Sequence, residues 1–98
     1  MALHKVKVVV KGALQTAFIF YGDGEEITLR KNGNTREGEK DIADNNGSIV
    51  LTFKGQGLAG TKWSIAITID DADKPQKEDN GRLTSGSVRK EYTITVAA

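Results

Sequence analysis

The chain has 98 residues, with 14 lysines and arginines against 13 aspartates and glutamates, so its formal net charge is +1. It contains no cysteine, which excludes a disulfide scaffold, a thiolate nucleophile and a cysteine-based zinc site. The balanced charge argues against a dedicated nucleic-acid binder, and no apolar run approaches the roughly 20 residues that a membrane span needs. A chain of this length predicts a single domain over residues 1–98.

The first segment alternates between apolar and basic residues. Val6, Val8 and Val10 share one face of residues 5–11, and three lysines share the other, which predicts a strand with one buried face. Because the lysines interrupt the apolar run, the segment is not a signal peptide. The sequence leaves two localisations open, a cytoplasmic protein or an exported domain without its leader.

Residues 14–21 are apolar on both faces. Phe18 and Phe20 lie on one face and Ile19 and Tyr21 on the other, so we expect this strand to be central in a sheet or to have its second face covered. Turn signals follow at residues 23–24 and 32–33, where Asp-Gly and Asn-Gly are typical of tight hairpins.

Residues 34–46 have the weakest pattern, with Ile42 as their only large apolar residue, and predict an edge strand or a loop. Clearer alternation over residues 48–53, 62–70 and 88–96 predicts three further strands, although Lys90 interrupts the inward face of the last one. Residues 71–87 are expected to form a long polar loop.

No window has a helical period, and turn signals separate the strands throughout. This pattern is typical of an all-β fold, and we predict a single antiparallel β-sandwich of seven or eight strands, immunoglobulin-like or jelly-roll-like. The order of the strands is not readable from the pattern.

Residues 55–60 match the G-x-G-x-x-G motif of dinucleotide-binding sites, which requires a helix after the glycines. The segment that follows reads as a strand, so we interpret the motif as a connection between strands. Gly57 and Gly60 remain candidate ligand contacts through exposed backbone amides, and Tyr21 and Trp63 are the candidate aromatic contacts. The phase of Trp63 with Ile65 favours a core position over a ligand platform.

Four aspartates, Asp70, Asp71, Asp73 and Asp79, crowd the segment before the last strand. Calcium takes six to eight oxygen ligands, and clustered carboxylates can supply them. The spacing matches no EF-hand loop, and the positive charges of two lysines in the same segment disfavour the binding of a cation. A solvated polar loop is the simpler interpretation, and calcium is the only cofactor that the sequence suggests.

The only histidine, His4, lies near the terminus, where chains usually fray, and we expect it to be functionally idle. Lys5, Lys7 and Lys11 would form a basic strip with Arg89 if the first and last strands paired. No catalytic constellation is recognisable, so the sequence predicts a protein that is not an enzyme.

The long loops at residues 43–48, 55–61 and 71–87 favour a non-enzymatic recognition module. Such a lectin-like module would present loops at one end of the sandwich to a carbohydrate or to a protein partner. The alternative is a structural subunit of a homo-oligomeric assembly of the pilus, capsid, tail or matrix type, because the terminal strands are rich in β-branched residues and could pair across chains.

Overall fold

The computed structural model describes residues 2–22 and 24–96, and these residues form an all-β sandwich, as predicted. These residues form nine strands, whereas the sequence predicts seven or eight. Two of the nine strands have only three residues each. In chain order they are β1 (Leu3–Lys11), β2 (Thr16–Tyr21), β3 (Glu25–Ile27), β4 (Arg30–Asn32), β5 (Thr35–Ala43), β6 (Ser48–Gln56), β7 (Lys62–Ile69), β8 (Lys77–Arg82) and β9 (Ser87–Thr95).

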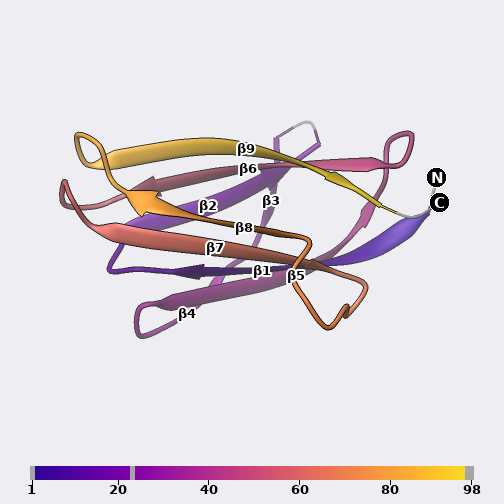
Figure 1. Cartoon of the computed structure of the whole chain (residues 1–98), viewed down its shortest axis with the longest axis horizontal. Helices are drawn as coiled ribbons and strands as arrows, with labels where there is room; N and C mark the ends of the chain where they lie inside the picture. The colour runs from indigo at the N-terminus through magenta and orange to yellow at the C-terminus, as the bar shows by residue number, and fades with distance from the viewer. Residues whose placement is uncertain (1, 23, 97–98) are drawn as a thin grey trace.

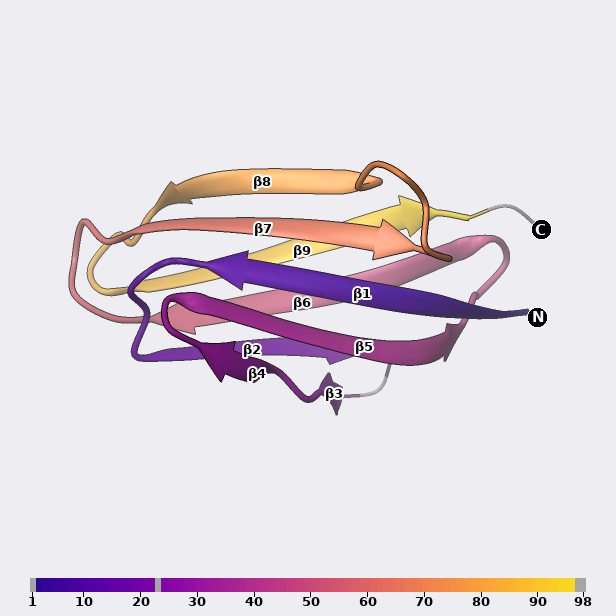
Figure 2. The same ribbon diagram turned by 90° about the horizontal axis from the view of Figure 1, so that it is seen from below.

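The strands form two antiparallel sheets packed face to face (Figure 1). The five-stranded sheet has the order β4-β5-β1-β7-β8, and the four-stranded sheet has the order β3-β2-β6-β9. Figure 2 shows the five-stranded sheet in front of the other, with β1 beginning and β9 ending at the same end of the molecule. Helices that are long and apolar enough to cross a membrane do not occur in the part of the chain that the structure describes.

The core lies between the sheets and consists of the inward residues of each alternating strand. The phenyl ring of Phe53 and the indole of Trp63 meet across it, with ring centroids 5.3 Å apart. Burying each such side chain contributes about 1.5–3 kcal/mol to folding. The largest side chains with no exposed surface or almost none are Phe53, Ile19, Ile27, Leu51, Ile65, Ile67, Val6, Val8 and Val10.

Residues 34–46, where the sequence predicts an edge strand or a loop, contain a nine-residue strand inside the five-stranded sheet. The inward positions of β5 include Arg36 and Gly38, so the apolar alternation that marks a strand is missing. Arg36 is buried and donates hydrogen bonds to the carbonyl oxygens of Leu14 and Gln15, at 2.8 and 3.3 Å. These bonds compensate for the burial of the guanidinium.

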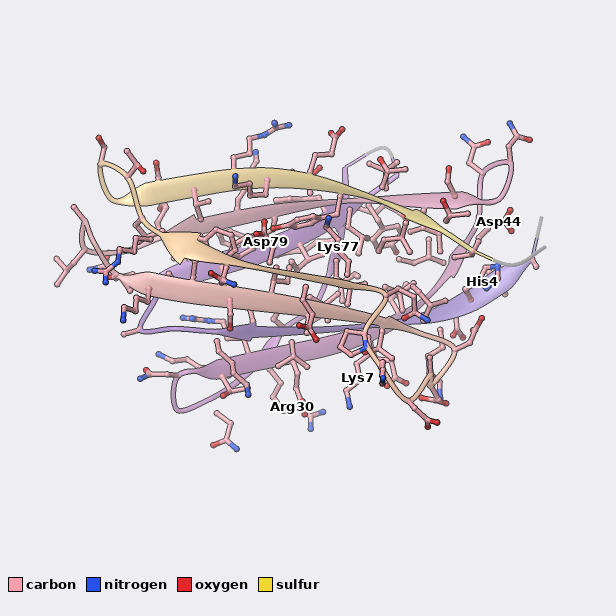
Figure 3. The ribbon with its side chains drawn as sticks, viewed as in Figure 1. His4, Lys7, Arg30, Asp44, Lys77 and Asp79 are labelled. Atoms are coloured by element: carbon pink, nitrogen blue, oxygen red, sulfur yellow. The ribbon has the colours of Figure 1, made fainter. Side chains whose placement is uncertain are left out.

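The expected loop over residues 71–87 is also partly wrong, because it contains β8. The inward residues of this strand are Lys77, Asp79 and Gly81, and none of them is apolar. In Figure 3, Lys77 and Asp79 point into the space between β8 and β9. The hydroxyl of Tyr92 on β9 donates to Asp79 Oδ2 at 2.8 Å, so a polar contact joins the two sheets at this side.

The first and last strands do not pair, so the expected extension of the basic strip by Arg89 is wrong. β1 lies between β5 and β7, whereas β9 pairs only with β6 in the other sheet. Lys5 and Lys7 lie opposite Asp41 and Glu39 on β5. The lysines of β1 therefore belong to a face of mixed charge and not to a basic surface.

Candidate binding surface

The outer face of the four-stranded sheet exposes apolar side chains in mid-strand. Phe18 is 40% exposed and Val50 is 43% exposed, and Phe20 is half-buried between them. The rings of Phe18 and Phe20 stack with centroids 6.1 Å apart and an angle of 28° between their planes. The expected central position of β2 is correct, but no element of the described chain covers its second face.

Strand register arranges this face in rows across the sheet. One row contains Phe18, Lys54 and Arg89, and the next contains Phe20, Thr52 and Glu91. The Nζ atom of Lys54 lies 5.3 Å from the centroid of the Phe20 ring, at the distance of a cation–π contact. We call these six residues the double row.

A groove of about 1110 Å³ starts at the double row and continues past the end of β2. Tyr21 lies in this groove together with polar side chains that include Glu25, Lys40, Asp41 and Asn45. Tyr21, one of the two aromatic residues that the sequence singles out as ligand contacts, thus borders an open groove.

The other candidate ligand residues lie elsewhere. The amide of Gly57 donates to the carbonyl oxygen of Gly86 and that of Gly60 to the carbonyl oxygen of Leu83, both at 2.9 Å, so these amides are not free for a ligand. The segment after the glycines is strand β7, which agrees with a connection between strands. Trp63 is 4% exposed and lies in the core, where its indole cannot stack on a ligand.

Three of the four candidate calcium ligands are engaged in contacts with other residues of the chain. Asp70 accepts from His4 Nδ1 at 2.8 Å and from the Lys5 amide at 2.9 Å, and Asp71 accepts from Lys5 Nζ at 2.9 Å. Asp79 lies on β8 and binds Tyr92, and Asp73 is exposed in the connection between β7 and β8. Within residues 2–22 and 24–96, no three histidine, aspartate or glutamate side chains gather as a metal site.

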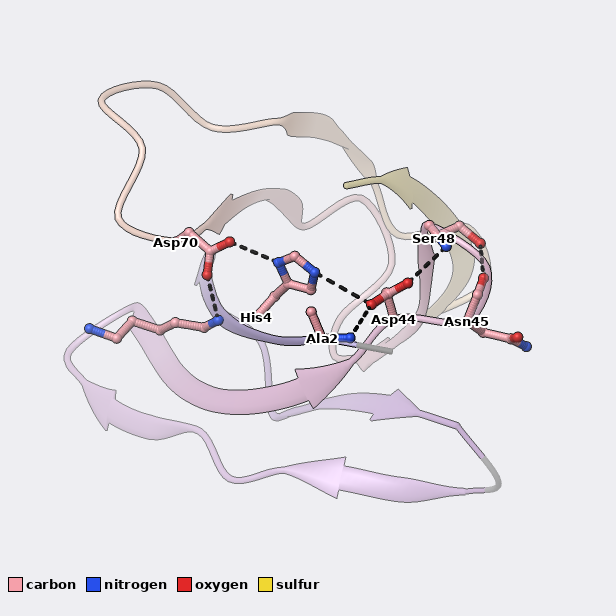
Figure 4. A network of polar contacts seen from close by, with 8 residues as sticks. Ala2, His4, Asp44, Asn45, Ser48 and Asp70 are labelled. Carbon is pink, nitrogen blue, oxygen red and sulfur yellow. Dashed lines mark hydrogen bonds and ion pairs between the residues drawn. The ribbon is translucent and has the colours of Figure 1, made fainter. Parts of the chain in front are cut away.

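A polar cluster around His4 is the feature that sequence reasoning missed (Figure 4). His4 is 6% exposed on β1, so the expectation that it frays is wrong. Its Nδ1 donates to Asp70, since an ionised carboxylate only accepts, and its Nε2 lies 3.6 Å from Asp44 Oδ1. Asp44 also accepts from the amides of Ala2 and Gly47, each at 2.8 Å.

The same contacts set the acidity of both carboxyl groups. The amides of Ala2 and Gly47 lower the pKa of Asp44, and the hydrogen bonds from His4 and from the Lys5 amide lower the pKa of Asp70. Both nitrogens of the imidazole face carboxylates in a buried position, so the cluster ties the start of β1 to the β5–β6 and β7–β8 connections. This arrangement fits a structural role.

Comparison with protein-family models, with curated proteins and with solved structures finds no match to this chain.

Proposed function

We propose that this protein is a non-enzymatic recognition module that binds a protein partner through the outer face of its four-stranded sheet. The observation that carries the proposal is the exposure of Phe18 and Val50 beside Phe20, in the middle of a regular sheet. Contiguous exposed apolar residues of this kind mark interaction sites in soluble proteins. The proposed site is the sheet face, whereas the sequence favours the loops at one end.

Three residues of the double row, Phe18, Phe20 and Arg89, are of types that are enriched at the centres of protein interfaces, whereas Lys54 and Glu91 are of types that are depleted there. Arginine and aromatic residues also recur among the side chains whose truncation to alanine weakens binding most. The ammonium group of Lys54 lies over the Phe20 ring, so a partner that contacts this ring must also accommodate or displace that charge. A partner that covers Phe18 and Phe20 would remove their exposed carbon surface from water.

Selection from a peptide library displayed on phage tests this proposal, because it does not require the partner to be identified first. We expect selection on the wild-type protein to enrich peptides that lose binding to Phe18→Ser and to Phe20→Ser. The matched control is Leu58→Ser, which removes an apolar side chain that is 75% exposed in the β6–β7 connection, away from the sheet face. Peptides that bind all variants equally, or a selection that enriches none, would contradict the proposal.

A carbohydrate ligand is the second candidate, and the end of the groove at Tyr21 favours it. An aromatic ring with amide and carboxylate groups around it can stack on a sugar ring and bind its hydroxyl groups. We expect a binding oligosaccharide to shift the ring resonances of Tyr21 in an NMR titration, and Tyr21→Ala to lose binding that Tyr21→Phe largely keeps. A panel of plant and microbial oligosaccharides that produces no shift at about 1 mM would argue against this candidate.

A further inference from the structure

We infer that the protein partner is a second copy of this chain, packed face to face with the first across a two-fold axis. This inference rests on the proposed function, since it names the occupant of the same sheet face. The pattern of charged and aromatic residues in the double row supports it.

The pattern is complementary to itself. Consider a two-fold axis that lies in the interface, runs across the strands and passes between the two rows. It places the first row of one copy over the second row of the other. Arg89 then faces Glu91 of the second copy and Phe18 faces its Phe20, and each of these contacts occurs twice. The strands of the two copies run nearly along one another, as in aligned sheet packing.

The charges of the double row are available for such contacts. On the outer face of the five-stranded sheet, Lys5 contacts Asp71 at 2.9 Å and Glu39 at 3.8 Å within the same chain. The ion pairs found among the described residues include neither Arg89 nor Glu91, and both side chains are exposed. Because Arg89 and Glu91 have opposite charges and lie two residues apart on one face, a two-fold contact can pair each of them with the other residue of the second copy.

The two longer edge strands, β8 and β9, offer a poorer route to self-association. β8 consists of polar residues and glycine, and β9 carries Lys90 on its inward side. Inward charges and charged edge strands discourage pairing of strands between molecules. β1, a valine-rich strand that the sequence suggests for such pairing, already has a neighbour on each side. The sheet face is therefore the favoured contact.

The size of the face predicts a weak dimer. β6 has nine residues, which gives a length of roughly 30 Å, and three long strands give a width of roughly 15 Å. A face with this length and width has an area smaller than the roughly 800 Å² that each partner contributes to a standard interface. We expect reversible dimers that are populated only at high protein concentration.

Sedimentation equilibrium with charge reversals tests the inference. We expect Arg89→Glu and Glu91→Arg each to weaken dimerisation by about tenfold or more, because each places two pairs of like charges in contact. An equimolar mixture of the two variants should regain the wild-type affinity or exceed it. In that mixture each carboxylate of one variant faces a guanidinium of the other.

Two controls carry the same changes of charge on the opposite sheet. Lys62→Glu on β7 and Glu78→Arg on β8 should leave the dimer unchanged at moderate salt. Circular dichroism verifies that all four variants keep the β-sheet spectrum of the wild type.

The failures of the two proposals can be told apart. A wild-type protein that stays monomeric up to the highest soluble concentration overturns the second copy as partner, while the peptide selection still decides whether the face binds protein. A dimer that resists both charge reversals, or a mixture that stays as weak as the single variants, overturns the two-fold arrangement.

Discussion

The imidazole of His4 shows how one buried polar side chain can fix three segments. It contacts Asp44, before the β5–β6 turn, and Asp70, after β7, while it belongs to β1 itself. Both carboxylates also accept hydrogen bonds from backbone amides, so each of them is held by a further contact besides the one to the imidazole. Because the imidazole is buried, removal of either carboxylate would leave one of its ring nitrogens without a partner, which is more unfavourable than the mean strength of a hydrogen bond suggests.

The lowered pKa values of Asp44 and Asp70 predict that the protein loses stability in acid. Because both folded-state values lie below the ordinary 3.8, the unfolded chain takes up these protons first. The stabilisation from these groups is present above pH 3.8 and is lost as the pH falls through the folded-state values. Urea unfolding between pH 7 and about pH 2 should show this loss.

The variant Asp70→Asn should be less stable than the wild type at pH 7, and its stability should depend less on pH in this range. Asp73→Asn is the control, because it alters an exposed residue of the same connection. Equal pH dependence of the wild type and Asp70→Asn would contradict the role assigned to Asp70.

At the scale of the strands, the edge strand β9 combines a long free side with an inward lysine. Lys90 lies opposite Phe53 in the β6–β9 register, on the side of the strand that bears Tyr92 and Ile94. Its side chain is nevertheless exposed, because the strand lies at the border of the sandwich. A charge in this position keeps other strands from adding to the edge.

We therefore expect Lys90→Ile to increase aggregation, even if it adds apolar contacts to the monomer. Static light scattering during incubation at high concentration measures this, with Lys62→Ile as the control for loss of an exposed charge on the outer face of the other sheet. A Lys90→Ile protein as soluble as Lys62→Ile would show that the inward lysine has no protective role.

Gly38 lies in the middle of β5. A Cβ atom at this position would lie 2.3 Å from the carbonyl oxygen of Thr28, so the segment that precedes β4 packs directly on the glycine. Gly38→Ala forces the backbone of one segment to move, and we expect a loss of about 2–3 kcal/mol in the free energy of unfolding. Chemical denaturation measures this loss, and Lys40→Ala, an exposed change on the same strand, should alter stability by only about 0.5 kcal/mol.

For the whole molecule, the polar contact between Tyr92 and Asp79 joins the two sheets where β8 and β9 face each other. The ring of Tyr92 is buried, and Lys77 Nζ lies 5.8 Å from its centroid. Burial first, and then the hydrogen bond to Asp79, raise the pKa of the phenol above the ordinary 10.0. The folded protein thus holds this proton more firmly than the unfolded chain does.

The raised pKa predicts a loss of stability in alkali. The contribution of Tyr92 is present below pH 10.0 and is lost as the pH rises through the folded-state value, because the unfolded phenol ionises first. Tyr92→Phe should reduce stability at neutral pH by about 1–3 kcal/mol, since Asp79 loses its donor. It should also make the decline above pH 10.0 less steep in guanidinium unfolding.

How much of this fold the sequence predicts depends on what fills the inward positions of each strand. Val6, Val8 and Val10 alternate with lysines, and all three are buried as expected. β5 and β8 are not recognisable as full strands, because their inward positions hold residues such as Arg36 and Asp79, which depend on partners far away in the chain. Alternation of hydrophobicity reports a strand only when its buried face is apolar.

The residues of the candidate site are likewise predictable only where a local pattern marks them. The double apolar pattern of β2 predicts a strand that is central or covered on both faces; the strand is central, and the pattern does not reveal that Phe18 and Phe20 lie on a face that the described chain leaves open. Tyr21 is a sequence candidate because it stands beside a turn, and its role stays a prediction. The cluster around His4 joins three segments that are distant in sequence, and nothing local marks them as neighbours.

The central place of β1 has a consequence for how the chain acquires its structure. This strand pairs with β5 and with β7, so that Val6 stands opposite Ile69. During synthesis β1 can pair first with β5, and Val6 gains its second neighbouring strand only after residues 62–69 have also been made. Such non-local pairing slows folding, and the valine-rich segment stays exposed meanwhile. The lysines between these valines then oppose aggregation of the nascent segment until its second neighbouring strand is in place.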